Sequence, residues 1–338
     1  MTQNHDTRKN ARRHPLGRGL LPLLAAGLLL LGPAAQARET LVFAHLFQRI
    51  SLQQEALIEA KQELLDRSGG EIDMDIKPDA KLGNQDSRIL DAVNFGQADM
   101  TFAGGPFAAR DYAPMGIIGA PYGFRDYTHW QHFKVSSLAR ELTAQYEKAS
   151  AQIVLGYYYN GERHLISRTP VRTLEDMAEL RIRVPNAPIY LQLFRTLGAK
   201  PVPLPLWQTY DALKQGNVDA AEKTLSMLED GEFYEVAPYV SLTGHISDIA
   251  LIVISSRRWS RLDAGQQQLV RDVFSKMADR LSERIHAKEL ANLEKLKRRG
   301  VTFIPVDRRA FIAKLAPLLN GNDFPWSGAL YERLQKIP

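Results

Sequence analysis

The segment Leu180–Pro188 places an arginine between an apolar strand and the start of a helix, an arrangement that suits anion binding. Alternation puts Ile182 and Val184 on one face of the predicted strand and Arg183 on the other. Pro185 stops the strand because it lacks an N–H, and Asn186 can cap the short helix that follows. A helix N-terminus offers N–H groups, and a guanidinium can bind a carboxylate through two hydrogen bonds. We therefore expect Arg183 to bind an anionic ligand, with a structural ion pair as the alternative.

Helical and strand patterns alternate along the rest of the chain. A helix with apolar residues on one stripe is expected over residues 51–65. The predicted strands are Leu41–Ala44, Glu71–Ile76, Gln152–Tyr158, Arg181–Val184 and Ile249–Ser255. Such alternation favours an α/β fold with mostly parallel sheets.

An internal repeat in the sequence supports two lobes of this kind. Residues 91–99 and 211–219 match in pattern, and each reads as a helix end, a glycine cap and a following strand. A chain of this length also exceeds the usual single core. We expect several short crossings between the lobes, which would permit hinge closure on a ligand.

A long helix is predicted near the C-terminus. Ser260 and Asp263 open a pattern that runs to Gly300, with apolar residues spaced by four at positions 269, 273, 277, 281 and 285. We expect this helix to brace both lobes.

The N-terminus has the pattern of a secretory signal peptide. Basic residues precede an apolar run from Leu20 to Leu31, and Ala35-Gln36-Ala37 fits a cleavage site. The run is short for a transmembrane helix, and no second apolar stretch of about 18 or more residues follows. We expect export by the ordinary secretory route, cleavage after Ala37, and a periplasmic protein that does not itself span the membrane.

Composition argues against several other classes of protein. The net charge is +5, but residues 1–37 carry +4 of it, which leaves no electrostatic case for binding nucleic acid or an anionic membrane. The chain has no cysteine, so thiolate metal sites and cysteine nucleophiles are excluded. His129 and His132 lie in a predicted exposed helix, and we expect no metal and no cofactor there. The common hydrolase, metalloprotease and phosphate-loop motifs are absent, so no catalytic residue and no enzyme activity are expected.

The mature chain resembles the substrate-binding proteins of tripartite ATP-independent periplasmic (TRAP) transporters, of the dicarboxylate and sialic-acid binding type. The resemblance is carried by Tyr159–His164, Leu180–Pro188, Gly198–Pro203 and Val218–Glu222, in that order. It implies a two-lobed, type II periplasmic binding-protein fold with a ligand cleft between the lobes. We place lobe I at residues 38–160 plus 249–288, and lobe II at residues 161–248 plus 289–338.

In this family the arginine of the Leu180–Pro188 segment forms a salt bridge with the substrate carboxylate, and here it is Arg183. Arg163 matches a second arginine of such sites, with an interlobe salt bridge as the alternative. Asn186 matches an asparagine that can approach the same carboxylate. Lys223 stands where the family usually has an asparagine, so it meets a second anionic group or pairs with a carboxylate such as Glu222.

Further residues are candidates for the cleft. His45 follows the first predicted strand, and Gln85 stands where relatives have a polar cleft residue. Tyr159, Glu222 and His245 are similarly placed, and Trp207 and Phe102 either wall a pocket or pack in the core.

The resemblance implies a receptor that binds a small organic acid and delivers it to the small and large membrane subunits of a TRAP transporter. The Val218–Glu222 segment favours a sugar acid, and Lys223 favours a C4 dicarboxylate as the alternative. Two alternatives from other classes are a periplasmic enzyme on carboxylated sugars, with Glu222, Lys223 or His45 as acid or base, and a binding protein that serves a membrane sensor.

Overall fold

A single mixed sheet of nine strands organises the protein in a computed structural model that describes residues 38–79, 86–321 and 323–338. The predicted signal peptide and Gln85 therefore lie outside the described residues. The strand order is β2-β1-β3-β8-β4-β7-β5-β6, and β9 pairs with β8. The strands are β1 (Glu39–Ala44), β2 (Ile72–Lys77), β3 (Met100–Gly104), β4 (Gln152–Ser167), β5 (Arg181–Val184), β6 (Lys200–Pro203), β7 (Ala220–Thr224), β8 (Tyr239–Ser255) and β9 (Thr302–Ile304).

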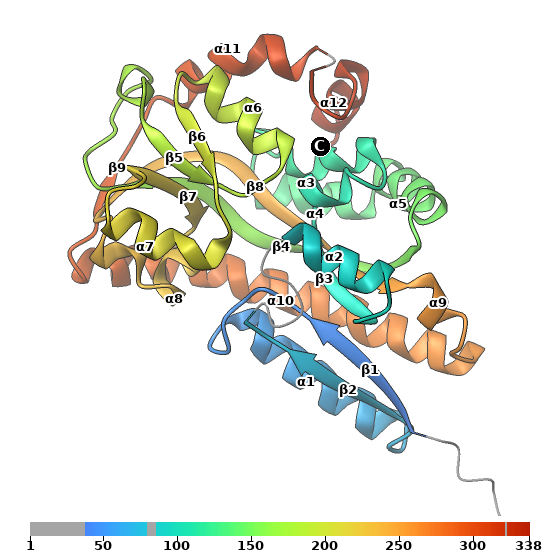
Figure 1. The fold of residues 1–338 in the computed structure, drawn as a ribbon. Helices are drawn as coiled ribbons and strands as arrows, with labels where there is room; N and C mark the ends of the chain where they lie inside the picture. The colour runs from blue at the N-terminus through green and yellow to red at the C-terminus, as the bar shows by residue number, and fades with distance from the viewer. Residues whose placement is uncertain (1–37, 80–85, 322) are drawn as a thin grey trace, which may run out of the picture. The chain divides into compact units, whose positions relative to one another are not determined.

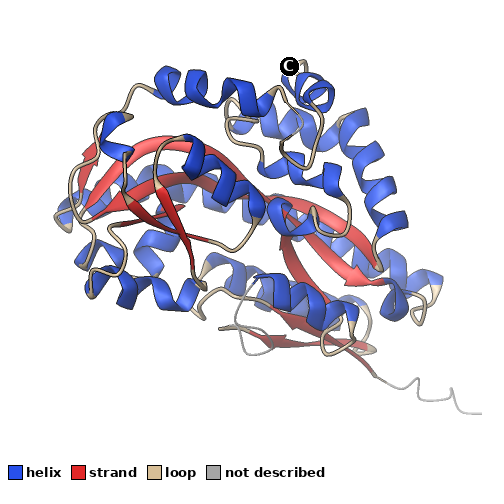
Figure 2. Ribbon diagram, turned by 45° about the horizontal axis from the view of Figure 1, so that its top comes forward, coloured by secondary structure: helices blue, strands red, loops and turns tan. Residues whose placement is uncertain are grey.

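Helices cover both faces of this sheet (Figure 2). The α-helices are α1 (Leu52–Arg67), α2 (Asp86–Asn94), α3 (Gly105–Ala108), α4 (Tyr127–Val135), α5 (Ser137–Ala149), α6 (Pro188–Thr196), α7 (Thr209–Lys214), α8 (Leu225–Asp230), α9 (Ser256–Trp259), α10 (Ala264–Arg298), α11 (Arg308–Leu319) and α12 (Gly328–Gln335). Four short 3-10 helices are η1 (Ala113–Gly119), η2 (Glu175–Met177), η3 (Leu206–Gln208) and η4 (Phe233–Glu235). Within the described part of the chain, no helix is long and apolar enough to cross a membrane.

Two long antiparallel strands join the halves of the sheet. β4 and β8 pair from Gln152 with Ser255 to Ser167 with Tyr239. Strands β1 to β3 lie toward one end of them and β5 to β7 toward the other (Figure 1). We call these groups, with the helices that follow their strands, the first lobe and the second lobe.

The expectation of mostly parallel sheets is correct within each lobe but wrong at the junction. β1 pairs in parallel with β2 and β3, and β5 with β6 and β7. The crossings are long strands rather than the short links that we expected. Asn160 and Gly161 form a pair typical of turns, but β4 continues through them. Register irregularities between Tyr159 and Glu162 absorb these residues while the pairing to β8 continues.

The two copies of the internal repeat occupy equivalent positions in the two lobes. Gly96 (φ 77°) follows α2, and Gly216 (φ 74°) follows α7, so both predicted glycine caps are confirmed. The carboxylate of Asp99 accepts a hydrogen bond from the N–H of Val42 on β1, and that of Asp219 accepts one from the N–H of Arg181 on β5. β1 and β5 therefore occupy equivalent positions in the two lobes, and the carboxyl ends of both strands face the junction between the lobes.

The predicted bracing helix is α10, which has 35 residues and spans roughly 50 Å. A capping box between Asp263 and Gln266 begins it, and Gly300 (φ 88°) follows its end. Its buried stripe includes Val273, Met277, Leu281 and Ile285, as expected. The helix packs on β4, on α1 of the first lobe and on α8 of the second lobe, so it braces both.

Candidate functional site

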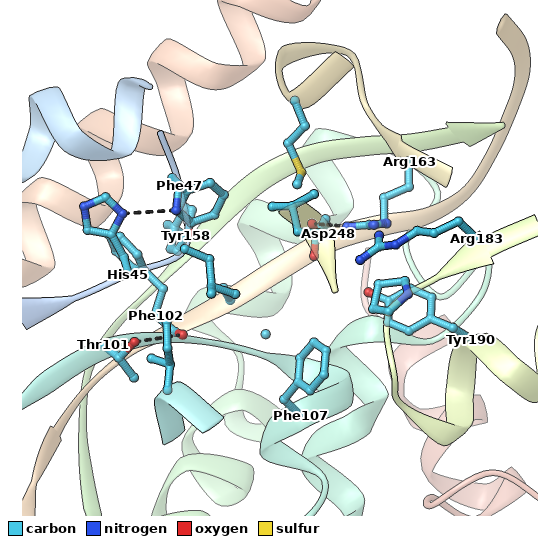
Figure 3. Close-up of a pocket in the computed structure, with 17 residues that line it drawn as sticks. His45, Phe47, Thr101, Phe102, Phe107, Tyr158, Arg163, Arg183, Tyr190 and Asp248 are labelled. Atoms are coloured by element: carbon cyan, nitrogen blue, oxygen red, sulfur yellow. Dashed lines mark hydrogen bonds and ion pairs between the residues drawn. The ribbon is translucent and has the colours of Figure 1, made fainter. Parts of the chain in front are cut away.

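A cavity opens at the junction, between the ends of β1 and β3 and the end of β5. Figure 3 shows two arginines on one side and a group of aromatic rings on the other. The lining residues are His45, Leu46, Phe47, Ile89, Thr101, Phe102, Gly104, Phe107, Tyr158, Arg163, Arg183, Pro185, Tyr190, Leu206, Met227, Asp248 and Ala250. They come from both lobes and from both crossing strands, so the cavity is interlobar.

Arg183 lies on the cavity wall contributed by the second lobe. It is only 2% exposed, and its Nε and Nη2 donate to the carbonyl oxygen of Leu204 at 2.9 and 2.6 Å. Leu204 follows β6, the strand that pairs with β5, so the sheet itself orients the guanidinium. Arg181, two residues earlier, is instead exposed and pairs with Asp219 at 2.6 Å.

Arg163 lies on β4, beside Arg183 in the cavity wall (Figure 3). Its Nη2 donates to Glu222 Oε1 at 2.6 Å, its Nε also contacts the Glu222 carboxylate, and its Nη1 donates to Asp248 Oδ2 at 2.7 Å. The guanidinium also lies 5.3 Å from the ring centre of Tyr190. Arg163 therefore forms salt bridges at the crossing, as in the alternative, but they join β4 to β7 and β8 and do not link the two lobes.

Glu222 is completely buried behind Arg163. Burial alone would raise the pKa of this carboxyl, but the charge of Arg163 and the hydrogen bonds from His245 and Arg163 hold it at about 2. Burial lowers the pKa of His245, whose Nε2 lies 3.5 Å from Glu222. Glu222 is thus a carboxylate that holds Arg163 in place, and it does not line the cavity.

A chain of buried hydrogen bonds extends from Arg163 to the first lobe. Asp248 accepts from Asn160 Nδ2 at 2.9 Å, and Asn160 Oδ1 accepts from Gln53 Nε2 of α1 at 2.6 Å. Asp248 lines the cavity, but the sequence reasoning missed it. The available signal was an acidic residue followed by the apolar run of β8, because such a residue is rarely buried without a partner.

His45 lies on the first-lobe side of the cavity, as predicted from its place after β1. Its Nε2 is bonded to Gln54 Oε1 at 2.8 Å, and its Nδ1 accepts from the N–H of Phe47 at 3.2 Å. These partners assign the proton to Nε2. Burial lowers the pKa of His45, so the ring is neutral at pH 7.

Besides Glu222, three other predicted site residues are not brought to this cavity. Asn186 is exposed and lines a separate cavity with Pro188 and Gln192. The predicted Asn186 cap is wrong, because Ala187 holds the N-cap position of α6 without a side-chain hydrogen bond. Backbone geometry, rather than side-chain type, placed the helix start one residue later.

Lys223 is buried on the opposite face of β7 from Glu222, because neighbouring residues of a strand point to opposite faces. Its Nζ lies 4.3 Å from the ring centre of Phe233, in the core of the second lobe. Lys223 is absent from the lining of the arginine cavity, where the expected contact with a second anionic group of the ligand would have to be made.

Tyr159 faces the opposite side of the sheet from the cavity. Its hydroxyl donates to Glu289 Oε2 of α10 at 2.8 Å, and the neighbouring Tyr158 lines the cavity instead. Counting alternate residues back from Arg163 would put Tyr159 on the cavity side. The register irregularity between Tyr159 and Glu162 shifts the alternation of side chains by one residue, so Tyr159 points away from the cavity. No local signal in the sequence indicated this shift.

Of the other residues considered from the sequence, some line a cavity and others do not. Phe102 lines the cavity, and Trp207 is 59% exposed and lines an adjoining one. His129 lies in a helix, as predicted, but it is buried and bonded to the carbonyl of Leu334 at 3.1 Å. Across the described ranges, no group of three or more His, Cys, Asp or Glu side chains is placed to hold a metal. What the site offers is two buried guanidiniums beside an aromatic wall, a combination suited to binding an organic anion.

Comparison with known proteins agrees with this geometry. The 2,3-diketo-L-gulonate-binding periplasmic protein of Escherichia coli is 28% identical over 291 residues, which cover 86% of this chain and 88% of that protein. A solute-binding protein of Roseobacter denitrificans is 25% identical over 307 residues, covering 90% of this chain and 93% of its own.

Solved structures are similar over the same length. A TRAP periplasmic solute-binding protein from Ochrobacterium anthropi with bound L-fuconate has a TM-score of 0.82 and 28% identity, covering 88% of this chain and 99% of that one. One from Actinobacillus succinogenes with bound L-galactonate has a TM-score of 0.83 and 26% identity, covering 88% and 98%. The likeness extends to the two-lobed type II fold.

The sequence model of bacterial extracellular solute-binding protein family 7 matches residues 43–322, which is most of the chain. The buried arginines at the interlobe cavity, the fold and this match agree, and the chain therefore belongs to family 7, the solute-binding proteins of TRAP transporters.

Proposed function

We propose that this protein is the periplasmic receptor of a TRAP transporter and that it binds the carboxylate of a small organic acid through Arg183, with Arg163 beside it. The observation that carries the proposal is the position of Arg183, buried on the cavity wall and oriented by the Leu204 carbonyl. A guanidinium held in this way loses little entropy when a carboxylate binds, which favours tight binding.

The first ligands to test are sugar acids. The relatives named above are a 2,3-diketo-L-gulonate-binding protein and two proteins with bound L-fuconate and L-galactonate, and all three ligands are sugar acids. A C4 dicarboxylate is the second candidate. It was suggested by Lys223 in the sequence, but Lys223 does not line the arginine cavity, so sugar acids come first.

Calorimetry on the Arg183→Lys variant tests the role of Arg183. Lysine keeps the charge but loses the planar fork, so we expect affinity for the bound acid to fall about tenfold or more. The matched control is Arg181→Lys on the same strand, where the arginine is exposed and pairs with Asp219. Unchanged affinity in Arg183→Lys, equal to that of the control, would refute the proposed role.

The remaining parts of the proposal concern the other site residues and the export of the protein. We propose that His45 contacts the ligand and that Glu222 acts through Arg163. Ligand contacts by Asn186 and Gln85 stay predictions, whereas Lys223 and Tyr159, which point away from the arginine cavity, are not proposed as contacts. Hinge closure between lobes bounded at residues 160/161, 248/249 and 288/289 is a prediction of the same kind. Export with cleavage after Ala37 predicts a mature chain that begins at Arg38, which mass spectrometry of the periplasmic protein measures.

Two functions from other classes make different predictions. An enzyme acting on carboxylated sugars would convert its ligand, whereas a receptor returns it intact, and chromatography of the released ligand distinguishes them. A sensor subunit would co-purify with a membrane kinase, whereas we expect this protein to associate with the small and large TRAP subunits in a reconstituted uptake assay.

A further inference from the structure

The cavity wall opposite the two arginines is aromatic. Figure 3 shows Phe47, Phe102 and Tyr158 on this side and Arg163 and Arg183 on the other. The ring of Phe102 lies 5.0 Å from that of Tyr158 and 5.9 Å from that of Phe47, centre to centre. We call this group of three rings the aromatic wall; Ile89, Phe107 and Ala250 also line the cavity.

The polar side chains beside the aromatic wall are already bonded within the protein. The hydroxyl of Thr101 donates to the carbonyl of Ala44 at 2.8 Å, and both ring nitrogens of His45 have partners. Gly104, at the end of β3, adds no side chain. A ligand hydroxyl buried here would lose hydrogen bonds to water and find few side-chain partners among the described lining residues.

A second cavity adjoins the first and is lined by large apolar side chains together with Gln48, Ser51, Asp79 and Asp230. The two share Leu46, Phe47, Leu206 and Met227, and the second adds Trp207, Tyr210 and Phe233. Its volume of about 240 Å³ exceeds the roughly 70 Å³ of the arginine cavity, so it provides room for a hydrocarbon group that extends past Phe47.

The charges of the described lining favour a single carboxylate. The two positive charges of Arg163 and Arg183 are matched by two negative charges, those of Asp248 and of Glu222, which lies behind Arg163. The charged side chains that line the second cavity are both acidic, Asp79 and Asp230, and they pair with Arg49 at 2.9 Å and Lys288 at 3.3 Å. A second carboxylate on the ligand would therefore meet either the aromatic wall or two acids of its own sign.

We infer that the ligand is a monocarboxylate whose end away from the carboxylate is a hydrocarbon group, packed against the aromatic wall. This inference rests on the proposed function, because it takes the carboxylate to lie at the arginines. It narrows the substrate class toward deoxy, branched or aromatic acids and away from fully hydroxylated sugar acids and dicarboxylates.

A pair of acids that differ in one hydroxyl tests the inference. L-Fuconate is 6-deoxy-L-galactonate, so it places a methyl group where L-galactonate has a hydroxymethyl. By calorimetry on the full mature chain, we expect L-fuconate to bind about tenfold more tightly or better. We expect 3-phenyllactate to bind at least as tightly as L-fuconate, and succinate more weakly than either. L-Galactonate binding as tightly as L-fuconate, or succinate binding most tightly, would overturn the inference.

A variant assigns the preference to the aromatic wall. Phe102→Gln adds an amide next to the far end of the ligand, and we expect the ratio of the two affinities to fall to about one. The matched control is Phe95→Gln, at a phenylalanine that is 79% exposed, and its ratio should equal that of the native protein. The ratio is measured within one protein, so a loss of folded fraction in Phe102→Gln does not change it. An unchanged ratio in Phe102→Gln would overturn the assignment.

Failure of the proposed function gives a different result from failure of this inference. If no carboxylate binds, or if Arg183→Lys binds all of them as the native protein does, the proposed function fails and the inference falls with it. If the acids bind through Arg183 but the hydroxylated one is preferred, only the inference fails.

Discussion

The two arginines of the cavity differ in how the protein holds them. Arg163 is bound by two buried carboxylates, whereas the carbonyl of Leu204 orients Arg183. Removing a cation from buried carboxylates leaves their charge uncompensated in a medium of low dielectric. Arg163 therefore has a structural role in addition to any contact with ligand.

The Arg163→Ala variant should lose about 3–5 kcal/mol in free energy of unfolding, because Glu222 and Asp248 lose their counter-ion. Urea denaturation followed by circular dichroism measures this. The control is Arg181→Ala, which breaks a solvent-exposed pair with Asp219 and should cost about 1 kcal/mol or less. Equal costs at the two positions would contradict the structural role of Arg163.

Lys223 is the residue whose predicted role changed most. Because its ammonium lies over Phe233 and not in the arginine cavity, Lys223→Met should keep the packing of the side-chain stem. We expect the affinity for the bound acid to stay within about twofold, as measured by calorimetry. A tenfold loss would show that Lys223 does reach the ligand.

At the scale of elements, the crossing of β4 and β8 supplies Arg163 and its partner Asp248. The bulged segment of β4 around Gly161 puts Asn160 and Arg163 on the cavity side, and Asp248 meets both of them from β8. Gly161 has φ 107°, which L side chains rarely adopt. The position of Arg163 therefore depends on a glycine two residues earlier.

Gly161→Ala should destabilise the protein by about 2–4 kcal/mol, through backbone strain and crowding. An added Cβ would lie 2.8 Å from Glu289 Oε1 and 3.1 Å from Thr224 Cβ. Gly300→Ala is the matched control, because Gly300 has φ 88° but nothing within 4 Å of an added Cβ. The difference in free energy of unfolding between the two variants isolates the crowding, and a difference near zero would contradict it.

At the scale of the whole molecule, α10 contacts both lobes and is bonded to the crossing strand β4 through a buried carboxyl. Glu289 accepts from the hydroxyl of Tyr159 and from the N–H of Glu162 at 2.6 Å, and His286 lies 3.7 Å away. Burial raises the pKa of Glu289 to about 7, with a smaller contribution from the charge of Glu162. Glu222 has the opposite behaviour, since its pKa of about 2 lies below the value of 4.5 in an unfolded chain.

These shifts predict opposite dependences of stability on pH. The contribution of Glu289 is fully present below about pH 4.5 and is lost as pH rises through about 7, amounting to up to about 3 kcal/mol. Glu222 contributes stability above about pH 4.5 that is lost as pH falls toward 2.

Glu289→Gln tests the first of these dependences, because glutamine resembles the protonated carboxyl and can keep both hydrogen bonds. Denaturant titrations at pH 5 and pH 8 should show a smaller difference in free energy of unfolding for this variant than for the native protein. Glu294→Gln on the exposed face of the same helix is the control and should leave the difference unchanged. The prediction would be contradicted if the native protein and the Glu289→Gln variant each had the same free energy of unfolding at pH 5 as at pH 8.

Local rules determined much of this protein from its sequence. The apolar spacing of α10, the glycines after α2 and α7, and the strand Arg181–Val184 depend on neighbouring residues, so they could be predicted correctly. Arg183 could be singled out for the same reason, since strand alternation and Pro185 are local signals. The resemblance to a family also pointed to Arg163, which does line the cavity.

Tertiary structure alone decided which other side chains meet those two arginines. Asp248 is 85 residues from Arg163 in the chain, and only the pairing of β4 with β8 brings them together. The irregularity before Glu162 turns Tyr158 toward the cavity and Tyr159 away, which no pattern of alternation reveals. Likewise, Glu222 and Lys223 are neighbours in sequence, but they lie on opposite faces of β7 and only Glu222 holds Arg163. Register between distant strands sets these faces, and it is fixed by packing over the whole sheet rather than by adjacent residues.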